Sequence, residues 1–87
     1  MDIQDTMEWY SARSLAVGEA FVGAVYSSFA QIAEHPEGAP LVYKKARRLV
    51  MHGFPYGIFY VYERKRVHVV AVMHWRRDPH DWQVRVR

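Results

Sequence analysis

The chain has 87 residues, contains no cysteine and carries a formal net charge of +3. This length predicts one domain over residues 1–87 that buries roughly 60% of its unfolded surface around a thin core. The lack of cysteine excludes disulfides and cysteine-ligated zinc sites and fits a reducing compartment. No signal peptide or apolar run of membrane-spanning length is recognisable, so we expect a soluble, cytoplasmic protein without membrane contact.

The charge is divided unevenly along the chain. Residues 1–40 carry six acidic side chains against one arginine, whereas residues 41–87 carry eleven basic side chains against three acidic ones. This basic second half predicts a polyanion or an acidic protein as its partner. The charge pattern alone does not choose between these two classes of partner.

The first forty residues predict a helical hairpin. Ile3, Met7 and Tyr10 recur at helical spacing, and we expect a break between the helices near residues 11–14. A second apolar stripe follows at steps of three and four, typical of a helix that buries one face. Its members are Phe21, Ala24, Val25, Phe29, Ile32 and Ala33. Pro36 ends this second helix, since proline cannot continue the helical hydrogen bonds.

The remainder of the chain predicts an antiparallel sheet of three strands, or of four. The expected strands are residues 46–51, 56–62 and 67–74, with a turn at 52–55 and a hairpin loop at Arg64-Lys65. If Glu63 faces Arg66, the expected pairs are Tyr60 with Val69, Phe59 with Val70, and Ile58 with Ala71. Both sheet faces are then largely apolar, so we expect a cover on each.

The segment after the last predicted strand is a candidate contact surface. It reads His74-Trp75-Arg76-Arg77-Asp78-Pro79-His80-Asp81-Trp82. Guanidinium groups held at a strand end recognise phosphates and carboxylates. We therefore predict that target binding involves His74, Trp75, Arg76, Arg77 and Trp82.

A structural interpretation of the same segment stands beside this one. Trp82 can fold back to close the core, and Asp78 can pair with one of the two arginines. His74 can cap its strand instead of acting as a general base. The histidines lack metal-ligand spacing, and no phosphate-binding loop or Ser/His/Asp arrangement is present, so we expect no metal and no cofactor.

Several segments, taken in order, are similar to one known family. They are the helical hairpin with Trp9-Tyr10, then Ile32 to Pro36, Phe54 to Tyr60, Val67 to Met73, and His74 to Trp82. Together they resemble the ParE/RelE superfamily of toxins from type II toxin–antitoxin modules, and most closely its ParE branch. The resemblance implies an α+β fold in which an N-terminal antiparallel helical hairpin packs on an antiparallel sheet.

The resemblance also implies a bacterial toxin involved in plasmid stabilisation, neutralised by an acidic, partly disordered antitoxin. ParE-like members poison DNA gyrase, whereas RelE-like members cleave messenger RNA in the ribosomal A site. Arg48 and Arg77 match basic positions of the nucleases, but Gly57 and Val50 replace two others, and no tyrosine follows Tyr62. We predict an inhibitor that binds gyrase and has no catalytic residues; the ribosome-dependent endoribonuclease is the alternative.

Two further expectations concern the surfaces of the fold. Members of the superfamily usually begin with a strand that this chain lacks, which leaves a sheet edge open. We expect a second copy in a homodimer, an antitoxin segment or Val84-Arg85-Val86 to fill that edge; a truncated toxin that only binds antitoxin is a third functional alternative. Nucleic acid or antitoxin contacts are expected at Lys44, Lys45, Arg47 and Arg48.

Overall fold

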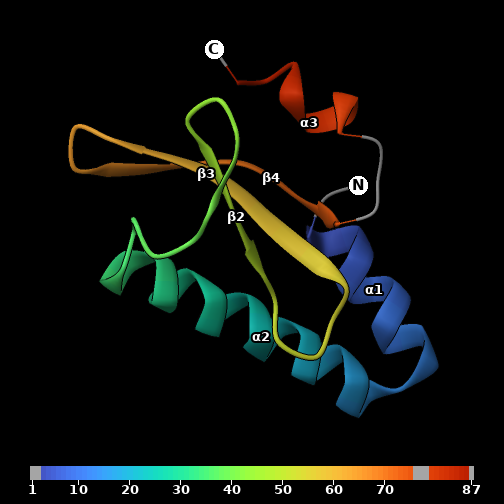
Figure 1. Cartoon of the computed structure of the whole chain (residues 1–87). Coiled ribbons are helices and arrows are strands. Elements are labelled where there is room, and N and C mark those ends of the chain that lie inside the picture. The colour runs from blue at the N-terminus through green and yellow to red at the C-terminus, as the bar shows by residue number, and fades with distance from the viewer. Residues whose placement is uncertain (1–2, 76–78, 87) are drawn as a thin grey trace.

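The chain folds into two helices, one antiparallel sheet and a short third helix. The structure, a computed structural model, describes residues 3–75 and 79–86. Its elements are α1 (Ile3–Arg13), α2 (Leu15–Glu34), β1 (Leu41–Tyr43), β2 (Ala46–Val50), β3 (Tyr56–Glu63), β4 (Arg66–His74) and α3 (His80–Gln83). The strands lie in the order β1-β2-β3-β4. Helices α1 and α2 lie on one side of the sheet and α3 on the other (Figure 1), which confirms the predicted α+β class.

Ser14 separates the two long helices, as the sequence predicts. Its backbone is extended, with φ −164° and ψ 129°, and its hydroxyl oxygen accepts a hydrogen bond from the Val17 N–H at 3.4 Å. A serine in this position satisfies one of the unpaired N–H groups at the start of α2. The helix ends at Glu34, two residues before Pro36, so both predicted boundaries are confirmed.

The core on the helical side of the sheet combines α2 with β3. Phe21, Val25 and Ile32 are buried with Ile58 and Tyr60 in one cluster. Successive members of this α2 set lie four and seven residues apart, which places them on one side of the helix. Burial of this stripe explains why α2 lies along the sheet.

Helix α2 also corrects the expectation that no apolar run approaches a membrane span. Leu15–Glu34 has 20 residues and a mean hydropathy of 1.3, long and apolar enough to cross a membrane by length and composition alone. The core helix of a soluble protein passes the same test. In this structure 28% of that apolar window is buried, and its buried apolar residues Phe21, Val25 and Ile32 pack in the core with β3.

The β3–β4 hairpin confirms part of the predicted register and corrects the rest. Its loop is Arg64-Lys65, both with positive φ (54° and 61°), as a tight two-residue turn of this hand requires. Glu63 pairs with Arg66 and Tyr60 with Val69 as predicted, but the register then shifts, and the following pairs are Phe59 with Ala71 and Ile58 with Val72. The predicted pairs Phe59 with Val70 and Ile58 with Ala71 are therefore wrong.

The register shift exchanges the faces of the last part of β4. One extra residue in a strand moves every later side chain to the opposite face. The predicted pair of Ile58 with Ala71 implies that Ala71, and Met73 two residues later, share the face of Ile58 and Tyr60. Both instead belong to the cluster that contains Phe59, and Val72 packs against the helical side. The shift thus places the small Ala71 beneath the chain's C-terminal segment.

That C-terminal segment forms a second core on the sheet face opposite α1 and α2. Trp82 and Val86 are buried there with Phe59, Val61 and Ala71. The Trp82 ring stacks on Phe59 with centroids 4.3 Å apart and planes 24° apart. The second apolar face is therefore covered in part by the chain itself.

The two outer strands of the sheet are β1 and β4. Strand β1 has three residues and supplies the fourth strand that the sequence left as an alternative. Val84-Arg85-Val86 does not pair with an edge as a strand; Val86 packs on the sheet face, and the Arg85 guanidinium donates to the Val70 carbonyl oxygen at 3.2 Å. The outer side of β4 is thus met by one side chain within the described residues, and no strand is added there.

Candidate functional site

The predicted contact surface begins at the end of β4, where the structure anchors its first two residues. The Trp75 N–H donates to the Pro55 carbonyl oxygen at 3.1 Å, which ties this position to the turn before β3. The rings of His74 and Trp75 lie 6.4 Å apart at an angle of 17°, and Trp75 is 39% exposed. Arg76 and Arg77 lie outside the described residues, directly after this aromatic pair.

Trp82 folds back onto the sheet and closes the core, as the structural interpretation of this segment expects. It is 4% exposed, stacks on Phe59 and meets the Tyr43 ring edge to face at 5.7 Å. A side chain so deeply buried supports the surface from beneath. His74 turns toward the helical side, where its ring lies 5.7 Å from that of Tyr56.

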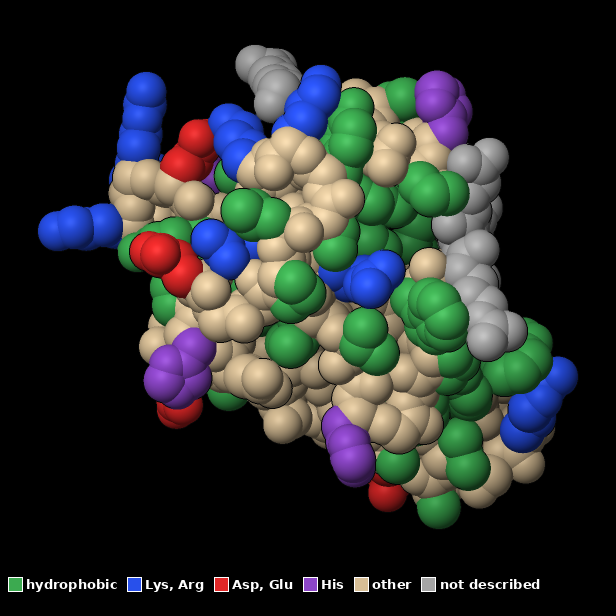
Figure 2. All heavy atoms as spheres, in the orientation of Figure 1, with side chains coloured by type: hydrophobic (Ala, Val, Ile, Leu, Met, Phe, Trp, Pro, Cys, Tyr) green, Lys and Arg blue, Asp and Glu red, His purple; other side chains and the backbone are tan. Residues whose placement is uncertain are grey.

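Three of the four predicted basic contacts are engaged within the fold. Arg47 donates to the carbonyl oxygens of Glu37 at 3.0 Å and Ala39 at 2.7 Å, which fixes the loop between α2 and β1. Lys45 forms an ion pair with Glu63 at 2.9 Å between adjacent hairpins. Lys44 has a positive φ of 50° and lies 5.2 Å from the centroid of Tyr43. Figure 2 shows Lys and Arg side chains gathered over these hairpin ends.

Arg48, the fourth basic contact, differs from the other three. It lies opposite Phe59 in the middle of the sheet, and its half-buried side chain has a buried Nε atom that finds no hydrogen-bond partner among the described residues. A buried unpaired N–H of a charged group is unfavourable unless a ligand or water satisfies it. Sequence patterns identified Arg48 as a candidate but gave no sign of this environment.

Gly57 provides the space in which the Arg48 side chain lies. A Cβ atom at residue 57 would lie 3.1 Å from the Arg48 Cγ and 3.3 Å from its Cδ. Glycine thus lets the apolar stem of the arginine lie close against the backbone of β3. The arginine is confined in this way, and a confined guanidinium recognises a planar anion with less loss of entropy than a free one.

The neighbours that the strand register gives Arg48 on this face of the sheet include no acid or base. A row here means the residues paired side by side across the strands. Arg48 shares its row with Phe59 and Ala71, and the next row on this face, toward Trp75, contains Val50, Gly57 and Met73. His68 shares this face but pairs with Val61, one row away in the other direction and two strands from β2. These strand positions offer a cation to a bound anion but place no acid–base pair beside it.

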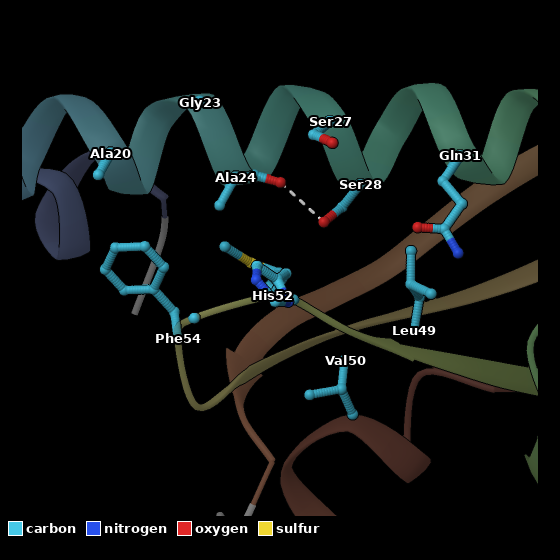
Figure 3. Close-up of a pocket in the computed structure, with 12 residues that line it drawn as sticks. Ala20, Gly23, Ala24, Ser27, Ser28, Gln31, Leu49, Val50, His52 and Phe54 are labelled. Atoms are coloured by element: carbon cyan, nitrogen blue, oxygen red, sulfur yellow. Dashed lines mark hydrogen bonds between the residues drawn. The ribbon is translucent and has the colours of Figure 1, made fainter.

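A groove lies between α2 and the end of β2, and few of its lining residues carry ionisable groups. It encloses about 780 Å³ and is lined by small α2 residues, such as Ala20, Gly23 and Ser27, and by Leu49 and Phe54. Figure 3 shows the helix and the strand facing each other across this space, with the Ser28 hydroxyl bonded back to the Ala24 carbonyl oxygen. His52 is the titratable residue of the lining, so the groove brings no catalytic set together.

The described residues also contain no group of three or more His, Asp or Glu side chains arranged to hold a metal ion. The shifted pKa values belong to Tyr10, Tyr60 and Glu63. Burial raises the pKa of the phenols, and the hydrogen bond from Lys45 lowers the pKa of the Glu63 carboxyl. None of these three groups lies next to Arg48 in the strand register.

Two helices on one face of a small antiparallel sheet, with a confined arginine on the other face, define a compact α+β protein suited to binding. Comparison with known families gives a more specific identity. The family model for the ParE toxin of the type II toxin–antitoxin system, parDE, matches residues 1–79. The chain therefore belongs to the ParE toxin family, and this membership implies an antitoxin as a partner. No curated protein and no solved structure matches the chain.

Proposed function

We propose that this ParE-family toxin inhibits bacterial DNA gyrase by binding to it, without a reaction of its own. The observation that carries this proposal is the environment of Arg48 on the sheet face opposite α1 and α2. Its guanidinium is confined, and its buried Nε has no partner in residues 3–75 and 79–86. Trp75 lies at the end of the same sheet, before the pair Arg76-Arg77 of the sequence. These groups suit the recognition of phosphates or carboxylates on a large partner.

Inhibition by binding requires that the toxin prefer one state of its target. A ligand shifts an equilibrium only by the difference between its affinities for the two states. A toxin that binds gyrase with cleaved DNA more tightly than the resting enzyme would hold the complex in that state. Such a mechanism needs cationic and aromatic contacts but no proton transfer by the toxin, and a gyrase target places the toxin in the bacterial cytoplasm.

The endoribonuclease alternative has less support from the described site. Attack by a ribose 2′-hydroxyl needs a group that accepts its proton, a group that protonates the leaving oxygen, and stabilisation of the phosphate charge. Arg48 can supply the last of these, but Gly57 and Val50 are its neighbours in the next row. The described residues around Arg48 therefore supply one part of that machinery.

We further propose that the antitoxin neutralises the toxin by adding an extended segment to the outer edge of β4. In the register after the two-residue turn, the backbone N–H and C=O groups of Val67 and Val69 point away from β3. Their side chains are 37% and 48% exposed, and the cationic residues 64–66 lie at the same end of the hairpin. An acidic segment with alternating apolar residues fits such an edge.

The central experiment compares two activities of the purified toxin. We expect inhibition of supercoiling by purified gyrase, with accumulation of cleaved DNA, and no cleavage of messenger RNA on programmed ribosomes. The double variant R76A/R77A should lose inhibition while it melts like the natural chain, as expected of charges that serve binding and not folding. Cleavage of ribosome-bound transcripts would contradict the proposal, and loss of folding in the double variant would show that the pair is structural.

A second experiment tests neutralisation separately. V69E should keep its toxicity in cells, read as growth arrest and filamentation, but should no longer be rescued by co-expressed cognate antitoxin. V84E, at an exposed position after α3, is the matched control and should still be rescued. Rescue of V69E would place the antitoxin elsewhere, whereas a natural chain that binds antitoxin but inhibits neither target would favour an inactive toxin.

A further inference from the structure

Helix α2 carries more apolar surface than the described fold buries. Its apolar window is 28% buried, whereas the core helix of a soluble protein is mostly buried. Leu15 and Tyr26 are each 71% exposed. In Figure 1 the side of α2 that faces away from the sheet is not covered by another described element. A large apolar helix surface is therefore open to a partner.

The apolar residues outside the core form one stripe along α2. Successive members lie seven, four, three and four residues apart, which places them on a common side of the helix. We call this set the outer stripe; its members are Leu15, Val22, Tyr26, Phe29 and Ala33. A helix with one apolar stripe in the core and a second one beside it is typical of a helix packed between two neighbours.

Gly23 lies next to the outer stripe, and the fold of the single chain does not require a glycine there. A Cβ atom at this position would meet nothing within 4 Å, and glycine in a helix interior is less favourable than alanine. It lies three residues before Tyr26, on the adjoining helix surface. A glycine in such a place lets the backbone of a second helix come close.

The charges of α2 favour a second helix that runs in the opposite direction. Its charged residues are Glu19 and Glu34, and Glu34 is the last residue, where the helix dipole disfavours a negative charge. In an antiparallel pair of α2 helices, Glu34 of each copy lies beside the positive start of the other helix, next to Arg13. Arg13 donates one N–H to the Trp9 carbonyl oxygen, and a guanidinium carries five such donors. A parallel pair would instead set like charges side by side.

The outer stripe is also complementary to itself in the antiparallel arrangement. A two-fold axis near residue 24 places Val22 opposite Tyr26 and Leu15 opposite Ala33, so that larger side chains meet smaller ones. Each Glu19 then lies about 15 Å along the axis from the Glu19 of the other copy, at a rise of 1.5 Å per residue. This separation exceeds the Debye length of about 8 Å at physiological salt.

We propose that the outer stripe of α2 is the interface of a symmetric, antiparallel dimer of this chain. A membrane surface is a poorer partner, because helices that lie on membranes carry Lys and Arg on their polar face, and α2 has neither residue. A single helix from each copy gives a small interface, so we expect a dissociation constant of about 10–100 μM.

The dimer leaves the binding face of each copy open. Arg48 lies on the sheet face opposite α1 and α2, so two Arg48 faces point away from the interface. The inference is independent of gyrase inhibition, and its test needs no gyrase.

The first test is sedimentation of the full chain at concentrations from about 5 to 500 μM. We expect the average mass to rise toward that of a dimer. Y26E places a carboxylate in the apolar contact, and G23L fills the space for the second helix; each should raise the dissociation constant at least about tenfold. Q31E changes the charge equally at an exposed position of α2 outside the stripe and is the matched control.

Thermal melts of dilute protein separate association from folding. G23L should melt at or above the temperature of the natural chain, because leucine favours a helix more than glycine does and its Cβ meets no neighbour in the single chain. A variant that folds at least as well but associates less identifies an interface. If Y26E fails to fold, G23L still decides the question.

The second test measures the direction of the two helices. The natural chain has no cysteine, so an introduced thiol reacts only where it is placed. Oxidation of a mixture of V22C and Y26C chains, distinguished by a tag, should form the mixed disulfide. A mixture of L15C and Y26C, whose positions are not opposed in the antiparallel dimer, is the control and should form far less.

Four results would overturn the proposal. A monomer at every concentration would exclude the dimer, and an unchanged dissociation constant in both Y26E and G23L would place its interface elsewhere. Disulfides formed mainly between two V22C chains would indicate parallel helices. Protection of Tyr26 only on addition of cognate antitoxin or lipid vesicles, with no self-association, would assign the stripe to that partner.

Discussion

The two faces of the sheet are built from similar apolar side chains but are covered in different ways. On one face, α2 places Phe21, Val25 and Ile32 over β3, with every one of these side chains at 5% exposure or less. On the other face, the short segment of Trp82 and Val86 covers the sheet next to Phe59. Beyond that cover, the row of Val50 and Gly57 lies beside Arg48.

This difference separates stability from binding. A long amphipathic helix can bury a continuous stripe, whereas a four-residue helix can cover only part of a sheet. The helical face is packed mainly by apolar side chains, whereas the opposite face keeps a charged group whose buried Nε has no hydrogen-bond partner among the described residues. Unfavourable groups of this kind are retained most often where they serve function.

The largest expected effect tests whether the C-terminal segment of Trp82 and Val86 contributes as much to the stability of the fold as α2 does. W82A and F21A each remove a buried ring and should each reduce the free energy of unfolding by about 3–5 kcal/mol, a large part of the total for a domain of this size. Thermal and denaturant unfolding measure both. W75A, at a position 39% exposed, is the control and should lose much less. If W82A melts like the natural chain, the second core contributes little to folding.

The next prediction concerns activity without stability. R48M keeps an unbranched apolar stem over Gly57 and removes the guanidinium, so the free energy of unfolding should change by no more than about 1 kcal/mol or increase. Gyrase inhibition should fall at least about tenfold, since charged hydrogen bonds contribute about 1.5–3 kcal/mol. K45M serves as a matched control and should inhibit normally. Full inhibition by R48M would move the contact to another surface.

A smaller effect on gyrase inhibition should follow when a side chain added at residue 57 displaces Arg48. G57A adds a Cβ atom 3.1 Å from the Arg48 Cγ, and the flexible arginine should shift at a stability cost of about 0.5–1.5 kcal/mol. We expect a several-fold loss of inhibition. A double-mutant cycle with R48A isolates the mechanism: G57A should have little further effect on inhibition in the R48A background. Additive losses would mean that Gly57 acts by another route.

A single hydrogen bond on the helical face gives a similar change in stability and none in activity. The Tyr60 hydroxyl donates to the Pro36 carbonyl oxygen at 2.8 Å, so Y60F should reduce the free energy of unfolding by about 1 kcal/mol. Burial raises the pKa of the Tyr60 phenol above its ordinary 10.0. The natural chain should therefore keep this contribution below pH 10 and lose it as pH rises through the folded-state pKa.

Denaturant unfolding at neutral and alkaline pH measures this titration. Y60F should lose less stability on alkalinisation than the natural chain does, because it has no phenol to ionise at this site. The same alkaline loss in both proteins would assign the effect to another tyrosine.

The smallest expected effect lies at the hairpin ends, away from both cores. The Lys45 ammonium lowers the pKa of the Glu63 carboxyl, so the pair stabilises the fold above the ordinary carboxyl pKa of 4.5 and loses that contribution as pH falls. Both side chains are nearly half exposed, so E63Q should change the melting temperature only marginally. The difference should vanish in high salt. A large loss would show that this ion pair orders the hairpins.

The sequence predicted the elements that depend on local pattern. The helical hairpin, its break within residues 11–14 and its end before Pro36 follow from apolar spacing and helix-breaking residues that act within a few positions. The strand limits and the pairing of Glu63 with Arg66 follow from the two-residue loop. The candidate site was found in part: Arg48 and Trp75 were identified by residue type, but their roles as contacts remain predictions.

The tertiary structure alone decided which side chains share a face. The register shift near Val70 reversed the expected positions of Ala71 and Met73, and the last residues of the chain closed the face that the sequence left open. It also engaged Arg47 with two carbonyl oxygens, whereas the Nε of Arg48 meets no partner in the described part of the chain. Adjacent arginines in one strand point to opposite faces, and what each meets there depends on residues far away in the chain.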